Sequence, residues 1–384
     1  MFNNVSAPTS APRTPARRTT VALLAAAVAA ATLLVSGAGA APATAAPVGV
    51  ASAPVASGAP VAVTAAKKRK KHRVASRLSV FDLSNTDDRL FGCSNSADFH
   101  DVRARLVGPR RVVRGYGGSP VVHVLVHDAG TGGWFWNLRG KGRYDYATKL
   151  ARRGVTTLVL SRLGYDGSPL ADGSSTCLQA QVAMLHQLVQ HLYAGIYDNP
   201  RDNRPTVHAA KVVLQGHGTG ATIAQMEAAR YSDVAGVVMM SPADPTSSTL
   251  ATRIQSQQRA TCRTSDYAPF GATAATYRAA LFSSAPTSVQ RAAVQRRNPT
   301  PCGEVDSLTS ATIAAATGGP LDIPVLLMTG GADERGSRTS VSTDARLTRV
   351  VVRGAGNALV LEKQAPAVRT RVLRWIGDTA FPGR

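Results

Sequence analysis

Short apolar runs, often β-branched, alternate along the chain with longer amphipathic segments. The runs have the length of strands buried on both faces of a sheet, and the segments between them have the period of covering helices. The predicted strands are Val121–His127, Val155–Ser161, Lys211–Gly216, Ala235–Ser241, Ile323–Gly330 and Thr348–Gly354. The predicted helices are Tyr144–Gly154, Leu178–Ile196, Ala221–Tyr231 and Ala365–Gly377. This alternation predicts an α/β fold with a mostly parallel sheet and helices on both faces.

Two stretches depart from the alternation. Within Val102–Gly115, the runs VRARLV and RRVVRG predict an antiparallel hairpin that leads into the sheet. Residues 242–321 are rich in Ala, Ser, Thr and Arg and contain no good strand. They predict a helical lid insertion over the carboxyl edge of the sheet, where open α/β folds bind ligands.

The first 45 residues predict a secretory signal peptide. Three arginines precede the uncharged run Val21–Val35, and Ala-x-Ala sites follow at residues 38–40 and 43–45. A positive region, an apolar region and a small-residue cleavage site are typical of export signals. The alternative is an uncleaved, alanine-rich membrane anchor. Either interpretation predicts a protein that is secreted or associated with the cell envelope.

Charge changes this picture only at the N-terminal end. The chain has 44 Lys and Arg against 23 Asp and Glu, a net charge of +21, but nine of the basic residues precede residue 74. Residues 74–384, the predicted α/β domain, therefore carry 35 basic and 23 acidic side chains, or +12. No nucleic-acid module accompanies this charge, so we do not expect nucleic acid as a partner.

A linker, residues 46–73, separates the signal from the domain. It is rich in Ala, Pro, Val and Ser and ends in the basic block KKRKKHR, Lys67–Arg73. This composition cannot bury a core and is typical of an extended spacer. The basic block could also bind an anionic surface of the cell envelope. Both interpretations are left open by the sequence.

Four cysteines in an exported chain favour disulfides. We expect Cys262 to pair with Cys302 and Cys93 with Cys177, although three connectivities are possible. There is no Cys-x-x-Cys motif and no cluster of His and Cys in the sequence. No metal site and no cofactor are therefore expected.

One segment has the layout of a nucleophile elbow. A strand leads into Gly216-His217-Gly218-Thr219-Gly220, and a helix follows. In this motif, small residues flank a tight turn that holds one side chain above the sheet, with backbone N–H groups aimed at the same spot. Here the sequence resembles the α/β-hydrolase family over roughly residues 100–380. The position of the nucleophile is held by Gly218.

Four further segments carry this resemblance in the family's order. His127–Gly130 is similar to the loop that supplies an oxyanion N–H, with Asp128 where glycine is usual, and Ser161–Pro169 resembles the segment after the next strand. Asp333 stands at the position of the triad acid and Asn357 at that of the triad histidine. The oxyanion and pocket positions implied by the resemblance are Thr219, Asp128, Ala129, His217 and His127.

Two of the three triad positions are wrong for acyl transfer. Gly218 has no side chain to act as nucleophile, and an amide such as Asn357 cannot act as a base near neutral pH. A shift of the alignment cannot supply the base, because none of the eight histidines follows His217. The family order requires serine, then acid, then histidine.

The sequence therefore predicts a non-catalytic pseudohydrolase. It would bind a small apolar ligand or a partner protein at the pocket or the lid insertion. One alternative is an active esterase, lipase or peptidase whose catalytic residues are not recognised. Another is a protein that binds polyanions of the envelope through its basic charge.

Overall fold

The computed structural model describes residues 71–86, 95–244, 246, 248–336 and 346–379. The expected export signal, Cys93 and all of the linker except Lys71–Arg73 lie outside the described residues. Among the helices within them, none is both long enough and apolar enough to cross a membrane.

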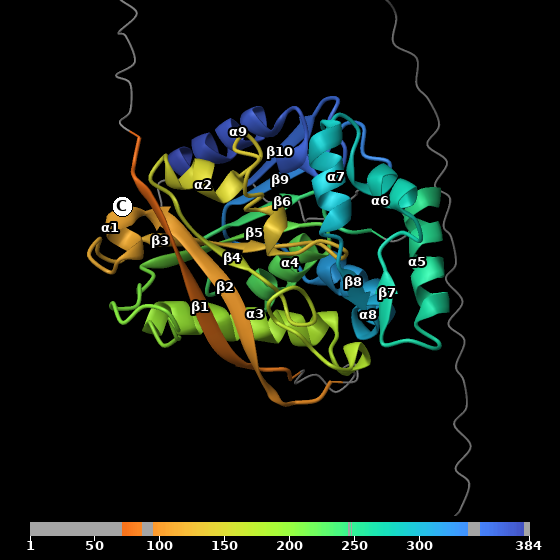
Figure 1. The fold of residues 1–384 in the computed structure, drawn as a ribbon, viewed down its shortest axis with the longest axis horizontal. Coiled ribbons are helices and arrows are strands. Elements are labelled where there is room, and N and C mark those ends of the chain that lie inside the picture. Colours follow the sequence, from red (N-terminus) through yellow and green to blue (C-terminus); the bar gives the residue numbers. More distant parts are fainter. Residues whose placement is uncertain (1–70, 87–94, 245, 247, 337–345, 380–384) are drawn as a thin grey trace, which may run out of the picture. The chain divides into compact units, whose positions relative to one another are not determined.

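A single eight-stranded sheet, in the order β1-β2-β4-β3-β5-β6-β9-β10, forms the centre of the domain (Figure 1). β1 and β2 are antiparallel to each other, β2 is antiparallel to β4, and all pairs from β4 to β10 are parallel. The strands are β1 (Val74–Ser84), β2 (Phe99–Pro109), β3 (Val121–Val126), β4 (Thr156–Leu160), β5 (Lys211–His217), β6 (Val237–Met240), β9 (Val325–Gly330) and β10 (Leu347–Val352). The predicted mostly parallel α/β sheet is confirmed.

Helices cover both faces of this sheet because its strands are apolar on both faces. Val124 of β3 packs in one cluster with residues of α3 and α4, whereas its neighbour Leu125 packs in a second cluster with α2 and α9. Figure 1 shows α2 and α9 on one side of the strands and α3 on the other. These helices are α2 (Tyr146–Ala151), α3 (Leu178–Ala194), α4 (Thr219–Tyr231) and α9 (Ala365–Asp378). The short α-helix α1 (Arg110–Val113) and the 3₁₀-helices η1 (Gly133–Phe135), η2 (Gly173–Ser175) and η3 (Leu359–Leu361) lie in the connections.

The hairpin predicted within Val102–Gly115 is wrong. Its first half lies in β2, but the antiparallel partner is β1, which pairs Val74 with Pro109 through Ser84 with Phe99. The second half begins with the short helix α1. Pro109 ends the strand because it has no N–H for a further hydrogen bond to the neighbouring strand. Val113, in the helical turn that follows, is buried and packs in the core.

Between β6 and β9 the chain forms mostly helices. They are α5 (Thr249–Thr261), α6 (Ala274–Leu281), α7 (Thr287–Gln295) and α8 (Cys302–Thr317), and the strands β7 (Tyr267–Pro269) and β8 (Pro299–Pro301) lie among them. We call this segment the insertion. The expectation that it lacks strands is wrong, because β7 and β8 pair antiparallel. Each has only three residues and contains proline, so neither forms an apolar run. The role of the insertion as a lid stays a prediction.

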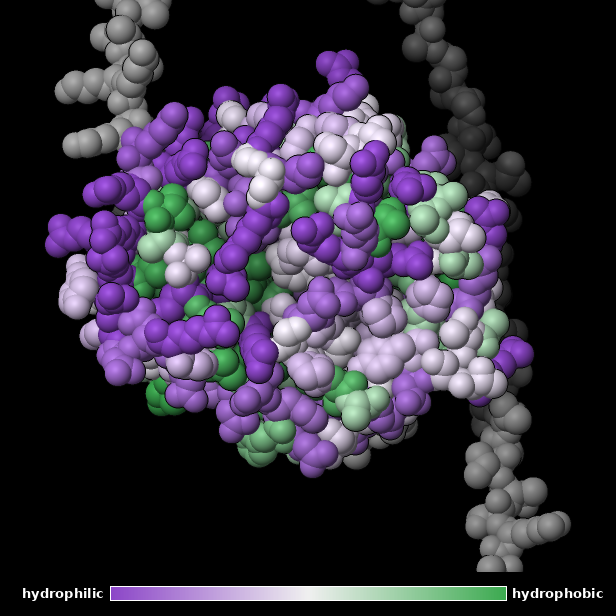
Figure 2. Space-filling model, viewed as in Figure 1, coloured by the Kyte–Doolittle hydropathy of each residue, from purple (hydrophilic) through white to green (hydrophobic). Residues whose placement is uncertain are grey.

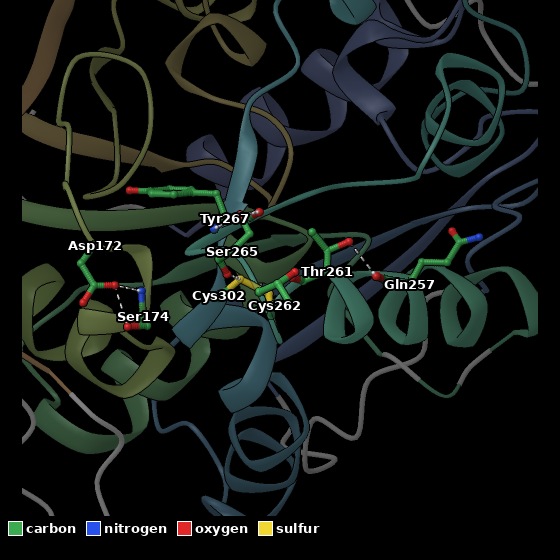
Figure 3. The surroundings of a disulfide bond; sticks show 9 residues. Asp172, Ser174, Gln257, Thr261, Cys262, Ser265, Tyr267 and Cys302 are labelled. Carbon is green, nitrogen blue, oxygen red and sulfur yellow. Dashed lines mark hydrogen bonds between the residues drawn. A yellow bond between two sulfur atoms is a disulfide. The ribbon is translucent and has the colours of Figure 1, made fainter.

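Three side-chain interactions fix the insertion to itself and to the domain. A disulfide joins Cys262, after α5, to Cys302, the first residue of α8 (Figure 3). Next to it, Glu304 forms a buried ion pair of 2.6 Å with Arg162 of the β4 loop. Farther along the chain, the buried carboxylate of Glu362 accepts hydrogen bonds from the backbone N–H groups of residues 283 and 284, after α6. Cys177 is also disulfide-bonded, and its expected partner Cys93 lies outside the described residues.

Candidate functional site: a hydrolase centre filled by an internal ion pair

The turn between β5 and α4 has the backbone of a nucleophile elbow. Gly218 has φ 54° and ψ −123°, a left-handed conformation that favours glycine. The turn lies close to the neighbouring loop: a Cβ on Gly220 would come within 2.4 Å of the Val126 carbonyl oxygen. The small residues of the motif are therefore required by space, and the elbow persists without a nucleophile.

The space above this elbow is occupied by the side chain of Asp128, from the loop after β3. A Cβ added to Gly218 would lie 2.0 Å from Asp128 Cγ and 2.2 Å from each carboxylate oxygen. Asp128 Oδ1 accepts hydrogen bonds from the backbone N–H of Thr219, at 2.7 Å, and of Ala129, at 2.8 Å. These are the two amides that the elbow and the β3 loop present to an oxyanion in hydrolases. In this protein they hold one of its own carboxylates.

The other oxygen of this carboxylate pairs with Arg335, two residues beyond the acid position. Arg335 Nη1 donates to Asp128 Oδ2 at 2.5 Å and to Asn357 Oδ1 at 3.1 Å. Both charged side chains are buried, with 9% and 0% of the Arg335 and Asp128 side chains exposed. Burial alone would raise the pKa of Asp128, but the Arg335 guanidinium and the Thr219 amide outweigh it and lower this pKa to about 2. The carboxylate is thus ionised at any physiological pH.

The positions of a triad acid and histidine do meet at this centre. Asn357 Nδ2 donates to Asp333 Oδ2 at 3.0 Å, as a histidine N–H would do in a hydrolase. Asn357 Oδ1 accepts from Arg335 and lies 2.8 Å from His217 Nε2. Asparagine therefore keeps the hydrogen-bond link to the acid. Its amide cannot transfer a proton. Instead, it connects Asp333 to the buried Asp128–Arg335 ion pair through hydrogen bonds.

The two histidines near the centre hold the structure and face no open pocket. His217 is buried and its ring stacks on Phe135, with centroids 4.2 Å apart. His127 Nδ1 lies 2.9 Å from its neighbour's carbonyl oxygen, and its Nε2 accepts from the Arg162 N–H at 3.1 Å. Burial lowers the pKa of both rings, and the Arg162 charge contributes for His127, so both are neutral.

The space beside the centre differs between its two sides. A cavity of about 20 Å³, roughly one water molecule, lies next to Arg335 and is lined by Ile254, Gln258 and Phe270 among others. The guanidinium of Arg335 lies 5.0 Å from the ring centroid of Phe270, which belongs to the insertion, so these two side chains close the centre on this side. A larger cavity of about 220 Å³ lies beside α4 and includes Ala243, whose N–H donates to the Gly218 carbonyl.

All eight implied site residues come together at this edge of the sheet, but the sequence analysis missed the residue that closes it. Arg335 follows the acid position within GGADERG and matches no catalytic motif. The signal that could have revealed it was a pair of charges: an aspartate where the oxyanion loop has glycine, and an arginine beside the triad acid.

Comparisons with known proteins identify the family and the fold. The model of the alpha/beta hydrolase family matches residues 124–370, more than half of the chain. A structure of the alpha/beta hydrolase GrgF from Penicillium sp. sh18 is 14% identical with a TM-score of 0.52, and the match covers 80% of this chain and 100% of that one. None of the curated proteins compared matches the sequence.

A structure of a putative aryl esterase from Burkholderia cenocepacia is 16% identical with a TM-score of 0.51, and the match covers 78% of this chain and 98% of that one. At such identities the likeness establishes the shared fold alone.

Proposed function

Because this chain belongs to the alpha/beta hydrolase family, we propose that it keeps the fold for binding and does not hydrolyse esters or peptides. The observation that carries the proposal is the Asp128 carboxylate on the amides of Thr219 and Ala129. A tetrahedral intermediate needs these same two donors. To bind there, a substrate would have to displace an ionised carboxylate from a buried arginine, which costs several kcal/mol.

The proposal predicts that the purified protein neither turns over short-chain p-nitrophenyl esters nor reacts with a fluorophosphonate probe. No side chain stands at Gly218 to form the covalent bond, and the eight histidines include none in the order that the family uses. Both assays are read against buffer alone and against Asn357→Ala. Covalent labelling, or turnover that disappears in Asn357→Ala, would contradict the proposal and favour an active hydrolase.

A cleft beside the β1–β2 edge of the sheet is lined by arginines. It supports the proposal that the ligand is anionic, whereas the sequence analysis expected an apolar ligand. The cleft has a volume of about 500 Å³ and includes Trp134 in its lining. Its charged lining residues are Arg103, Arg105, Arg139, Arg201, Arg296 and Asp166. Hydrophilic side chains predominate over β1 and β2 in Figure 2.

The arginines of this cleft repel one another. Burial, followed by the charges of Arg139 and Arg201, lowers the pKa of Arg105. Among the described residues, no ion pair is formed by Arg103, Arg105, Arg139 or Arg201. A bound phosphate or carboxylate group would relieve this repulsion through charge-assisted hydrogen bonds. An anionic ligand is consistent with a protein exported to the envelope, and the Cys262–Cys302 disulfide supports an oxidising compartment.

Tripolyphosphate is the probe for this cleft. We expect binding that weakens steeply with salt and falls at least ~10-fold in Arg103→Ser with Arg105→Ser, since each charge-assisted bond is worth about 1.5–3 kcal/mol. Calorimetric titration measures it, with Arg253→Ser, an exposed arginine of α5, as the matched control. Binding that survives the double substitution and is lost on deletion of Lys67–Arg73 would assign the anion to the basic block instead.

A further inference from the structure

Three potential metal ligands meet at the end of α4 that is remote from the elbow. His186 projects from α3, Glu227 from the last turns of α4, and Asp233 follows that helix. Their ligand atoms all lie within 4.8 Å of one another. Glu227, the member of the cluster nearest to Gly218 along the chain, is nine residues away on the same helix, or about 14 Å at 1.5 Å per residue. The cluster is therefore distinct from the hydrolase centre.

Glu227 is the unusual member of the cluster. Its side chain is fully buried, and neither carboxylate oxygen has a hydrogen-bond partner among the residues that the structure describes. The Oδ1 atom of Asp233, also buried, has no such partner in the same part of the chain. Buried acceptors are normally satisfied by donors. Two carboxylates that converge without a donor need either a shared proton or a cation between them.

The other two ligands are already held in position. His186 Nδ1 lies 2.8 Å from Asp233 Oδ2, and the His186 ring stacks on Tyr231 at a centroid distance of 3.7 Å. Asp233 Oδ2 also accepts from Gln190, and the Asp233 carbonyl accepts from the Tyr193 hydroxyl at 2.7 Å. The contacts with Tyr231, Gln190 and Tyr193 would orient the two ligands as outer contacts do in protein metal sites, whereas the ion would take the place of the direct contact between His186 and Asp233.

We propose that His186, Glu227 and Asp233 form a binding site for one Zn²⁺ ion. One imidazole nitrogen and two carboxylates are a donor set that zinc accepts, whereas calcium and magnesium prefer oxygen alone. Tetrahedral zinc with bonds of about 2.0–2.2 Å needs its ligands some 3.3 Å apart, so the three side chains would close in slightly. The exposed fractions of His186 and Asp233, 28% and 16%, give the ion and a fourth, water ligand access.

The charges of the cluster suit a divalent cation. Zinc binds deprotonated carboxylates, and the charge of the ion would be balanced by Glu227 and Asp233.

The test titrates ZnCl₂ into the EDTA-treated, desalted full-length protein by calorimetry. We expect one ion per chain and a melting temperature that rises with zinc. Glu227→Gln should reduce the affinity by more than the 10–100-fold typical of outer contacts. His186→Phe, which keeps the ring on Tyr231, should weaken binding similarly.

Two comparisons separate a metal site from a merely structural role. Glu227→Gln keeps the shape of the side chain and removes a buried carboxyl group that has no hydrogen-bond donor among the described residues, so its melting temperature without zinc should not fall. His208→Gln, which removes an exposed histidine outside the cluster, should bind zinc as the unaltered protein does. The proposal is overturned if the unaltered protein shows no saturable zinc binding, if the cluster variants bind equally well, or if only calcium or magnesium stabilises it.

Discussion

Gly218→Ser combined with Asn357→His is expected to give no measurable esterase activity, although it restores the two missing triad groups. A Cβ at Gly218 would lie 2.0–2.2 Å from the Asp128 carboxylate, which also occupies the Thr219 and Ala129 amides. Adding Asp128→Gly and Arg335→Met removes this carboxylate together with its buried counter-charge. We expect the fourfold variant to hydrolyse p-nitrophenyl acetate at least ~10²-fold faster than the double variant, the usual value of an oxyanion donor.

The matched control combines Asn357→His, Asp128→Gly and Arg335→Met and retains Gly218. It has the open oxyanion site and the histidine but no nucleophile, and it should remain inactive. Circular dichroism and thermal melting of all variants show whether the fold survives. If the double variant is already as active as the fourfold one, Asp128 does not block the centre, and the basis for the proposed loss of catalysis is removed.

Much of the fold could be predicted because β3, β4, β5, β6 and β9 are short, mostly apolar and buried runs. The antiparallel edge could not, because β1 mixes polar and apolar residues and its true partner begins 15 residues after its end. The triad positions followed from three segments of the family resemblance, those around Gly218, Asp333 and Asn357. The closed centre did not, because Asp128 and Arg335 are 207 residues apart and only the sheet brings their loops together.

Asp128→Asn is expected to destabilise the protein by about 3–5 kcal/mol at pH 7, because it removes one partner of the buried Asp128–Arg335 ion pair. The unaltered protein should also lose stability in acid. The folded pKa of Asp128, about 2, lies below the unfolded value of about 3.9. Its contribution of roughly 2–3 kcal/mol is thus complete above about pH 4 and is lost as the pH falls through 2. Urea unfolding between pH 7 and pH 2 measures both effects.

Asp202→Asn is the control for this prediction. Asp202 pairs with Arg204 at 2.8 Å on the surface, where water screens the charges, so its removal should leave the free energy of unfolding at pH 7 nearly unchanged. Asp128→Asn should flatten the acid dependence below pH 4, whereas Asp202→Asn should not. Equal stabilities for the two variants would mean that the buried ion pair does not hold the centre closed.

The proposed zinc site shows a second limit of sequence analysis. His186 and Glu227 are 41 residues apart and lie on different helices, so no local spacing marks them as ligands. A search for Cys-x-x-Cys or for neighbouring histidines finds only sites built from one segment. The packing of α3 against α4 creates this one.

The three interactions that fix the insertion bear on the predicted lid. The disulfide joins the end of α5 to the start of α8, Glu304 joins α8 to Arg162, and Glu362 joins the residues after α6 to the last loop of the domain. A segment held at these separate points cannot swing open on one hinge. If the insertion acts as the predicted lid, we expect its opening to require local unfolding, which has a high free energy and is therefore rare.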